Sequence, residues 1–174
     1  MIVLLFIGLL SKIALADDWH DAQFYSFSPQ VGSGKGVSYV ITGIGRITGV
    51  RVWEASRSVI YGFQFRYDHT WTNVVGRESG EKQEIELFDD EAIVAISGKY
   101  SHNIQSVVFT TNLGRSLFAG QPSGHSFNMY PENKKAELRF ISGRFQGAIT
   151  SMGAHWGLVT EPYGTNPHTN ATHV

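Results

Sequence analysis

An internal repeat is the sequence feature that most restricts the fold of this chain. Residues 96–106 read ISGKYSHNIQS, and the same pattern returns at residues 141–151 as ISGRFQGAITS. A weaker third echo covers residues 47–50, which match residues 104–107. Self-similarity of this kind indicates one supersecondary unit that is used several times. Because Gly98 and Gly143 occupy matching places in the two strong copies, we expect them to mark turns between strands.

Period-two alternation of apolar and polar residues predicts strands over much of residues 22–159. In the run from Ser58 to Tyr67, we expect one face of a strand to carry Val59, Tyr61, Phe63, Phe65 and Tyr67. Further strands are predicted at residues 46–53, 83–88, 91–97, 104–111 and 136–142. Clusters of Gly, Pro, Asn and Asp separate these runs, and helical periodicity is missing from them. The chain is therefore predicted to be all-β.

The repeat also suggests how the strands are arranged. Repeated four-stranded units favour three Greek-key sheets packed around a pseudo-threefold axis, although the repeat alone leaves a sandwich or a barrel open. A chain of 174 residues is most simply one domain, long enough to bury about two-thirds of its unfolded surface. Its 19 glycines and 13% aromatic residues suit short twisted strands joined by tight turns.

Composition excludes several classes of function. A net charge of −1 argues against bulk attraction to nucleic acid or to anionic lipid. With no cysteine, disulfides and thiolate metal sites are impossible, and the scattered histidines predict neither a metal site nor a cofactor. Asp68 and His69 read as ordinary turn residues, and neither a nucleophile elbow nor a phosphate loop occurs. We therefore do not expect an enzyme.

The two ends of the chain differ from its middle. Residues 1–16 are predicted to be a secretory signal peptide, because an apolar run is followed by Ala14-Leu15-Ala16. This run is too short to span a bilayer, so we expect a secreted protein without a transmembrane segment. A single domain is predicted over residues 17–159. Residues 160–174 are expected to form a flexible polar tail, in which Asn170 begins a glycosylation sequon.

Four segments together resemble a known family. They are GSGKG (32–36), YDHTWTNVVGRESGEKQEIEL (67–87), SGKY (97–100) and LRFISGR (138–144). Over residues 22–158 the chain is similar to the animal zymogen granule protein branch of the jacalin-related lectins. The resemblance implies a β-prism I fold, non-enzymatic sugar binding at one end of the prism, and secretion by way of zymogen granules.

The resemblance also implies which residues bind sugar. Family members combine a glycine-rich loop with a Gly-x-x-x-Asp loop, which here places the site at Gly32, Ser33, Gly34, Lys35, Gly36, Gln146, Gly147, Ala148, Ile149 and Thr150. The chain departs from this pattern, because Gln146 stands at the Gly position and Thr150 at the Asp position. Losing a charge-assisted hydrogen bond of this kind costs about 1.5–3 kcal/mol. A nearby loop is predicted to add polar contacts through Ser101, His102 and Asn103.

Two functions remain open from the sequence. The first is a secreted lectin for mannose-type or for acidic and sulfated glycans on mucins, proteoglycans or microbial walls. The alternative is a glycan-silent prism that acts through protein–protein contacts. The cations could form an acidic-glycan patch or a solvated face mixed with carboxylates; they are Arg46, Arg51, Arg57, Arg66, Lys99, Arg115, Arg139 and Arg144.

Overall fold

A computed structural model describes residues 25–55 and 58–158 of the chain. Within these residues every regular element is a β-strand, so the all-β prediction is confirmed. The predicted signal peptide at residues 1–16, the predicted tail at residues 160–174 and Asn170 lie outside the described residues.

The strands form three antiparallel sheets, each with its own strand order. The first sheet consists of β1 (Tyr25–Gly32), β13 (Ile149–Gly157), β12 (Glu137–Phe145) and β2 (Val37–Ile41). The second consists of β10 (Ser116–Gly120), β9 (Ile104–Thr111), β8 (Ile93–Tyr100) and β11 (His125–Met129). The third consists of β5 (Thr70–Trp71), β4 (Ile60–Tyr67), β3 (Ile47–Glu54) and β7 (Glu81–Glu86), with β6 (Val75–Gly76) also paired to β4.

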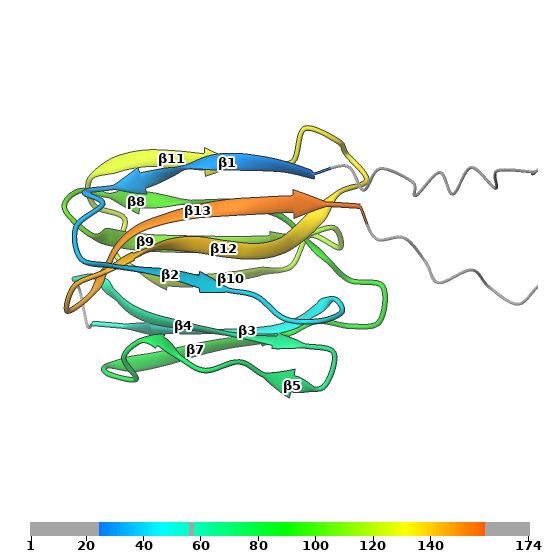
Figure 1. Ribbon diagram of the computed structural model, residues 1–174, viewed down its shortest axis with the longest axis horizontal. Coiled ribbons are helices and arrows are strands. Elements are labelled where there is room, and N and C mark those ends of the chain that lie inside the picture. Colours follow the sequence, from blue (N-terminus) through cyan, green and yellow to red (C-terminus); the bar gives the residue numbers. More distant parts are fainter. Residues whose placement is uncertain (1–24, 56–57, 159–174) are drawn as a thin grey trace, which may run out of the picture.

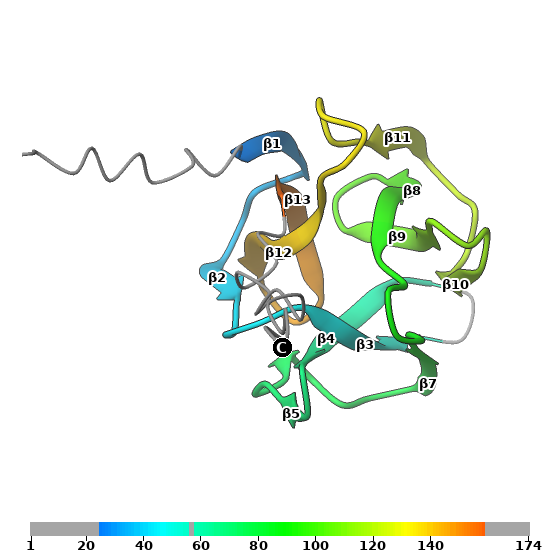
Figure 2. The same cartoon turned by 90° about the vertical axis from the view of Figure 1, so that its right-hand side faces the viewer.

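Each sheet is built around one central hairpin. These hairpins are β12–β13, β8–β9 and β3–β4, and each is flanked on both sides by strands from elsewhere in the chain. Viewed end-on, the three sheets surround a common centre (Figure 2). This is the three-sheet arrangement of a β-prism I fold, and it decides between the prism, the sandwich and the barrel that the repeat left open.

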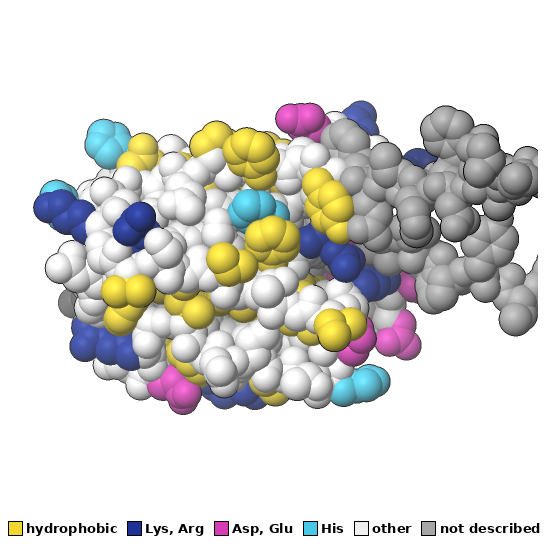
Figure 3. All heavy atoms as spheres, viewed as in Figure 1, with side chains coloured by type: hydrophobic (Ala, Val, Ile, Leu, Met, Phe, Trp, Pro, Cys, Tyr) yellow, Lys and Arg dark blue, Asp and Glu magenta, His cyan; other side chains and the backbone are white. Residues whose placement is uncertain are grey.

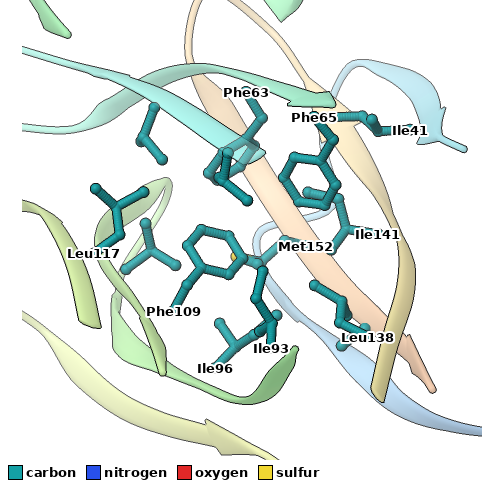
Figure 4. Packing of buried hydrophobic residues seen from close by; sticks show 14 of the residues in the cluster. Ile41, Phe63, Phe65, Ile93, Ile96, Phe109, Leu117, Leu138, Ile141 and Met152 are labelled. Atoms are coloured by element: carbon teal, nitrogen blue, oxygen red, sulfur yellow. The ribbon is translucent and has the colours of Figure 1, made fainter. Parts of the chain in front are cut away.

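Side chains from all three sheets meet in one core (Figure 4). Phe109 from β9 contacts Phe63 and Phe65 from β4 edge to face, with ring centroids 6.2 and 5.9 Å apart. Met152 and Ile141 from the first sheet are fully buried in the same cluster. Because a buried side chain of this size contributes about 1.5–3 kcal/mol, this shared core holds the sheets together.

The two strong copies of the repeat are the hairpins β8–β9 and β12–β13. The expectation that Gly98 and Gly143 mark turns was wrong, since both lie within strands. Their common role is close backbone approach: a Cβ on Gly98 would overlap the Ser106 carbonyl, and one on Gly143 would overlap the Ser151 carbonyl. Glycine is required at both places because no side chain fits there.

The third copy of the repeat was placed wrongly at residues 47–50. Those residues lie on β3, the first strand of its hairpin, whereas residues 104–107 lie on β9, the second strand. The matching residues on the third sheet are instead 60–63, because Tyr61, Gln105 and Thr150 each accept a hydrogen bond at the backbone carbonyl from an outer loop. The same hydrogen bond therefore recurs in all three sheets, and the sequence similarity between the copies is weakest in β4.

The face assigned to residues 58–67 was correct only in its second half. Phe63, Phe65 and Tyr67 are buried as expected, but Ile60 is buried and Tyr61 is partly exposed. A register irregularity opposite this point, between Trp53 and Glu54, breaks the alternation. A β-bulge inserts one residue and so moves the following side chains to the other face.

Candidate functional site

One end of the prism collects the loops named by the sequence. The β1–β2, β8–β9 and β12–β13 loops lie at the left in Figure 1, whereas β1 begins and β13 ends at the right. The sheets thus bring residues 32–36, 101–103 and 146–148 to the same end, although they are far apart in the chain.

The β1–β2 loop lies against the β12–β13 hairpin, and residues 32–36 together with 144–150 are called the first cradle. The Ser33 amide donates to the Thr150 carbonyl at 3.0 Å. Gly32 and Gly36 have φ angles of +105° and +95°, and a Cβ on either would overlap a backbone carbonyl of the hairpin. Only glycine combines positive φ with such close approach, so these residues are needed to seat the loop.

Thr150, at the position where the resemblance implies a carboxylate, is turned inward. Its side chain is buried, and its hydroxyl donates to the Lys35 carbonyl at 2.5 Å. A carboxylate could not make this bond, because ionised Asp has acceptors only. In this chain Thr150 therefore fastens the loop to the hairpin and does not offer its hydroxyl proton to a ligand.

Other groups of the first cradle face outward. Gly34 and Gly147 are exposed, and a Cβ on either would meet nothing within 4 Å, so a ligand can reach their backbone. Lys35 and Gln146 are exposed as well. The side chains of the two remaining predicted site residues, Ala148 and Ile149, are buried, so they can offer only backbone groups.

Arg144 is a cradle residue that the sequence had placed only in a general list of cations. It is exposed, and its guanidinium donates to the Gly36 carbonyl at 2.8 Å. Neither Arg144 nor Lys35 forms an ion pair with any described residue. The Ser33 hydroxyl is buried and has no hydrogen-bond partner among residues 25–55 and 58–158. The cradle thus holds two unneutralised cations and one unused hydroxyl.

The hydroxyl of Tyr39 supports the cradle from below. It donates to the Ser151 carbonyl at 3.1 Å, next to Thr150. Burial raises the pKa of Tyr39 far above its ordinary value, because the phenolate would lose its hydration. The hydroxyl therefore stays protonated and keeps its role as donor.

The loop of Ser101, His102 and Asn103 belongs to a different hairpin. Its backbone is closed by the Ser101 amide, which donates to the Asn103 carbonyl at 3.0 Å. The outer loop that contacts this hairpin is the β10–β11 loop, through the Gln121 amide and the Gln105 carbonyl at 3.0 Å. Hydrogen bonds between described residues therefore connect the hairpin that carries these three residues to the β10–β11 loop, through Gln105, and not to the first cradle.

Most of the remaining cations are paired with carboxylates. The ion pairs include Arg46–Glu137 at 2.7 Å, Arg51–Glu84 at 2.9 Å and Arg115–Glu91 at 2.6 Å. A hydrogen bond from Arg51 holds the pKa of Glu84 below its usual value. For these cations the mixed solvated face is the better interpretation; Arg57 lies outside the described residues.

Two hollows of the surface lie away from the first cradle. A hollow of about 330 Å³ is lined by Arg46, Asp68 and Asp90 among others, and one of about 400 Å³ by Ile44 and Trp71 among others. Within the described part of the chain, no group of three or more His, Cys, Asp or Glu residues could hold a metal ion.

The comparison with known families settles the class of protein. The family profile described as the Jacalin-like lectin domain matches residues 28–155. The chain belongs to the jacalin-like lectin family. Membership of this lectin family confirms the resemblance inferred from the four segments, and it places the chain in a carbohydrate-binding, non-enzymatic class.

Individual relatives agree with this assignment. Human zymogen granule membrane protein 16 is 38% identical over 140 residues, which cover 79% of this chain and 83% of that protein. The crystal structure of a prostate-specific WGA16 glycoprotein lectin has a TM-score of 0.68 at 30% identity, covering 76% of this chain and 99% of that chain. The agglutinin of Calystegia sepium has a TM-score of 0.65 at 20% identity, covering 76% and 96%, and supports the fold alone. Within the described residues, no helix is long and apolar enough to cross a bilayer.

Proposed function

We propose that this lectin is secreted through secretory granules and binds acidic or sulfated glycans at the first cradle without a metal ion. The observation that carries the proposal is the pair of unneutralised cations, Lys35 and Arg144, beside the exposed backbone of Gly34 and Gly147. The name of the human relative, zymogen granule membrane protein 16, supports the granule route.

The same geometry disfavours mannose as the main ligand. A mannose-type site needs a carboxylate that accepts hydrogen bonds from two sugar hydroxyls, and residues 32–36 and 144–150 contain no Asp or Glu. A sulfate or carboxylate on a glycan would instead accept charge-assisted hydrogen bonds from Lys35 and Arg144, which are about twice as strong as neutral ones.

The test measures binding of the full chain to a sulfated heparin-type oligosaccharide, a mannoside and an uncharged control sugar over a series of salt concentrations. We expect binding of the sulfated ligand alone, with affinity that falls as salt rises. Lys35→Ala should weaken it about tenfold, since one charge-assisted bond contributes about 1.5–3 kcal/mol. Lys134→Ala removes an exposed lysine of the β11–β12 loop, which lies at the opposite end of the prism (Figure 1), and should change little. Equal losses in both variants, or stronger binding of the mannoside, would contradict the proposal.

A row of aromatic side chains, of which Phe27 is exposed and Phe140 and His155 are partly buried, favours the second candidate, a prism that acts through protein contacts. On the outer face of the first sheet the His155 ring stacks on Phe140 with centroids 4.0 Å apart and on Phe27 at 6.4 Å. Phe27 is 70% exposed and Val40 is 56% exposed. Figure 3 shows hydrophobic side chains spread over this face, and exposed patches of this kind often mark interaction surfaces.

Sedimentation of the wild type and of Phe27→Ser separates the two candidates. If protein contacts are the function, the wild type associates, the variant does not, and no glycan binds to either. A monomeric wild type that binds the sulfated oligosaccharide leaves the lectin function as the only one supported.

A further inference from the structure

A hollow of about 400 Å³ lies at the end of the prism opposite the first cradle. It opens between the β2–β3 loop and the turn that joins β4 to β5, at the right in Figure 1. Small-molecule pockets have volumes of about 300–1,000 Å³ and combine an apolar lining with a few well-placed polar groups. The hollow has this size, and the glycan binding proposed for the first cradle does not use it.

Two glycines hold the β2–β3 loop against the turn and so shape the hollow. A Cβ on Gly43 would overlap the Tyr67 ring. A Cβ on Gly45, which has a φ of +90°, would overlap the Asp68 carboxylate. The side chain of Ile44, between these glycines, lines the hollow and is 93% exposed. Its apolar surface is therefore available to a ligand.

The aromatic lining of the hollow is fixed by contacts on its far side. The Tyr67 hydroxyl donates to the Arg139 carbonyl at 2.7 Å. Burial raises the pKa of Tyr67 far above its ordinary value, so the hydroxyl stays protonated and this bond persists. The Arg51 guanidinium lies 3.8 Å from the ring centroid of Trp71, and such a cation–π contact restrains the ring. Tyr67 and Trp71 thus present a preformed apolar surface.

Asp68 supplies the charge of the hollow. Its exposed carboxylate accepts a hydrogen bond from the Arg46 amide at 3.2 Å, and it forms no ion pair with any residue of 25–55 or 58–158. The two arginines beside the Trp71 ring are neutralised by carboxylates of β7; the pairs are Arg51–Glu84 at 2.9 Å and Arg66–Glu86 at 3.2 Å. The unbalanced charge is therefore negative, which favours a cation.

We propose that this hollow binds a small cationic amine with an apolar body, independently of any glycan at the other end. The ammonium donates to the Asp68 carboxylate and to the exposed hydroxyls of Thr42 and Thr70, which line the same hollow. The apolar body packs against Ile44 and Trp71. An uncharged ligand would gain the apolar contacts alone, since charge-assisted hydrogen bonds are about twice as strong as neutral ones, and an anion would be repelled by Asp68.

The experiment is a backbone-amide NMR titration of the full chain with 2-phenylethylamine, 2-phenylethanol and 3-phenylpropionate. At neutral pH these probes carry a positive charge, no charge and a negative charge on a similar phenyl body. We expect the amine to cause saturable shifts at residues 42–45 and 67–72. The alcohol should bind at least about fivefold more weakly, and the acid should not bind.

Three variants test the assigned contacts. Asp68→Asn removes the charge but keeps a side chain that tolerates the φ of +48° at this position, so it should weaken the amine to the level of the alcohol. Ile44→Ser should weaken the amine and the alcohol alike, by about two- to fivefold, because it removes an apolar contact. Asp89→Asn is the matched control, since this exposed carboxylate lines the neighbouring hollow, and it should change neither.

Three results would overturn the proposal. The first is equal binding of the amine and the alcohol, and the second is unchanged amine binding by Asp68→Asn or shifts outside the hollow. The third is a set of shifts at residues 42–45 that depends on protein concentration without a probe, because a second copy of the chain would then cover the hollow. None of these results bears on the glycan test, which concerns the first cradle.

Discussion

Replacing Thr150 by valine removes one hydroxyl group and leaves the shape of the side chain nearly unchanged. In the wild type that hydroxyl donates to the Lys35 carbonyl at 2.5 Å and fastens the glycine-rich loop to β13. A single hydrogen bond contributes about 0.5–1.5 kcal/mol net. Because Lys35 is exposed, water can reach its carbonyl in the variant, so the larger cost of a buried unpaired group does not apply. We expect Thr150→Val to lower the free energy of unfolding by about 1 kcal/mol.

The assay is urea unfolding followed by tryptophan fluorescence, since Trp156 is fully buried and reports on the core. Thr110→Val is the matched control, because its hydroxyl lies 3.4 Å from that of Ser116 on an exposed edge and should contribute less than about 0.5 kcal/mol. If ordering of the loop is needed for binding, Thr150→Val should also weaken sulfated ligands by up to about fivefold. Equal stability of wild type and Thr150→Val would refute the role given to this hydroxyl.

Thr150→Asp tests the same contact by replacing the hydrogen-bond donor with a group that can only accept. The new carboxylate would face the Lys35 carbonyl as a second acceptor, in a place that is 3% exposed in the wild type. Burying a charge without a partner is strongly unfavourable, so we expect a larger loss of stability than with valine and no mannoside binding. Tight mannoside binding by this variant at wild-type stability would show that the loop rearranges freely.

Three further predictions concern the scaffold. Gly36→Ala should lower the melting temperature more than Gly34→Ala, because both need positive φ, at a cost of about 1–2 kcal/mol, but only Gly36 also approaches a carbonyl. Phe109→Ala should cost about 3–5 kcal/mol in urea unfolding, since its ring joins two sheets. Burial lowers the pKa of His155, so the unfolded chain binds a proton more readily below about pH 6.5. Stability should therefore fall as the pH drops through the interval between the two pKa values, and His155→Phe should reduce this dependence; an equally steep profile in the variant would contradict it.

Alternation predicted the strands whose two faces differ in environment, and it failed where they do not. β9 alternates between buried and partly exposed residues along much of its length and was predicted at its observed bounds. β13 is buried along almost its whole length. Its small and polar residues are therefore buried together with its apolar ones, and no alternation of apolar and polar residues marks the strand. In the short outer strands β2 and β10 apolar residues such as Val37, Val40 and Phe118 are exposed, so apolar residues stand at outward positions and hide the alternation.

The residues of the first cradle could be found from the sequence, but the role of Thr150 could not. The motif placed Thr150 at a ligand position, and its inward turn depends on where the Lys35 carbonyl lies. That position is fixed in turn by the positive φ of Gly32 and Gly36 and by their contact with the hairpin. The spacing Gly-x-x-x-Gly occurs six times in the sequence, and only the structure shows that residues 32–36, 76–80 and 120–124 are the three loops with this spacing that join outer strands and contact a hairpin.

Backbone groups hold the outer loops on the hairpins, whereas side chains determine what each copy of the unit can bind. This explains how one unit can occur in all three sheets with different chemistry. In each copy the contact between outer loop and hairpin uses amides, carbonyls and glycines, and in the first cradle the Thr150 hydroxyl adds one further hydrogen bond. That position is Tyr61 in one copy and Gln105 in another, so it varies without loss of the scaffold. Ligand chemistry must then come from the exposed residues that the repeat does not dictate. Lys35 and Arg144 in the first cradle are residues of that kind, and for this reason we expect specificity to follow their charge and not the glycine pattern.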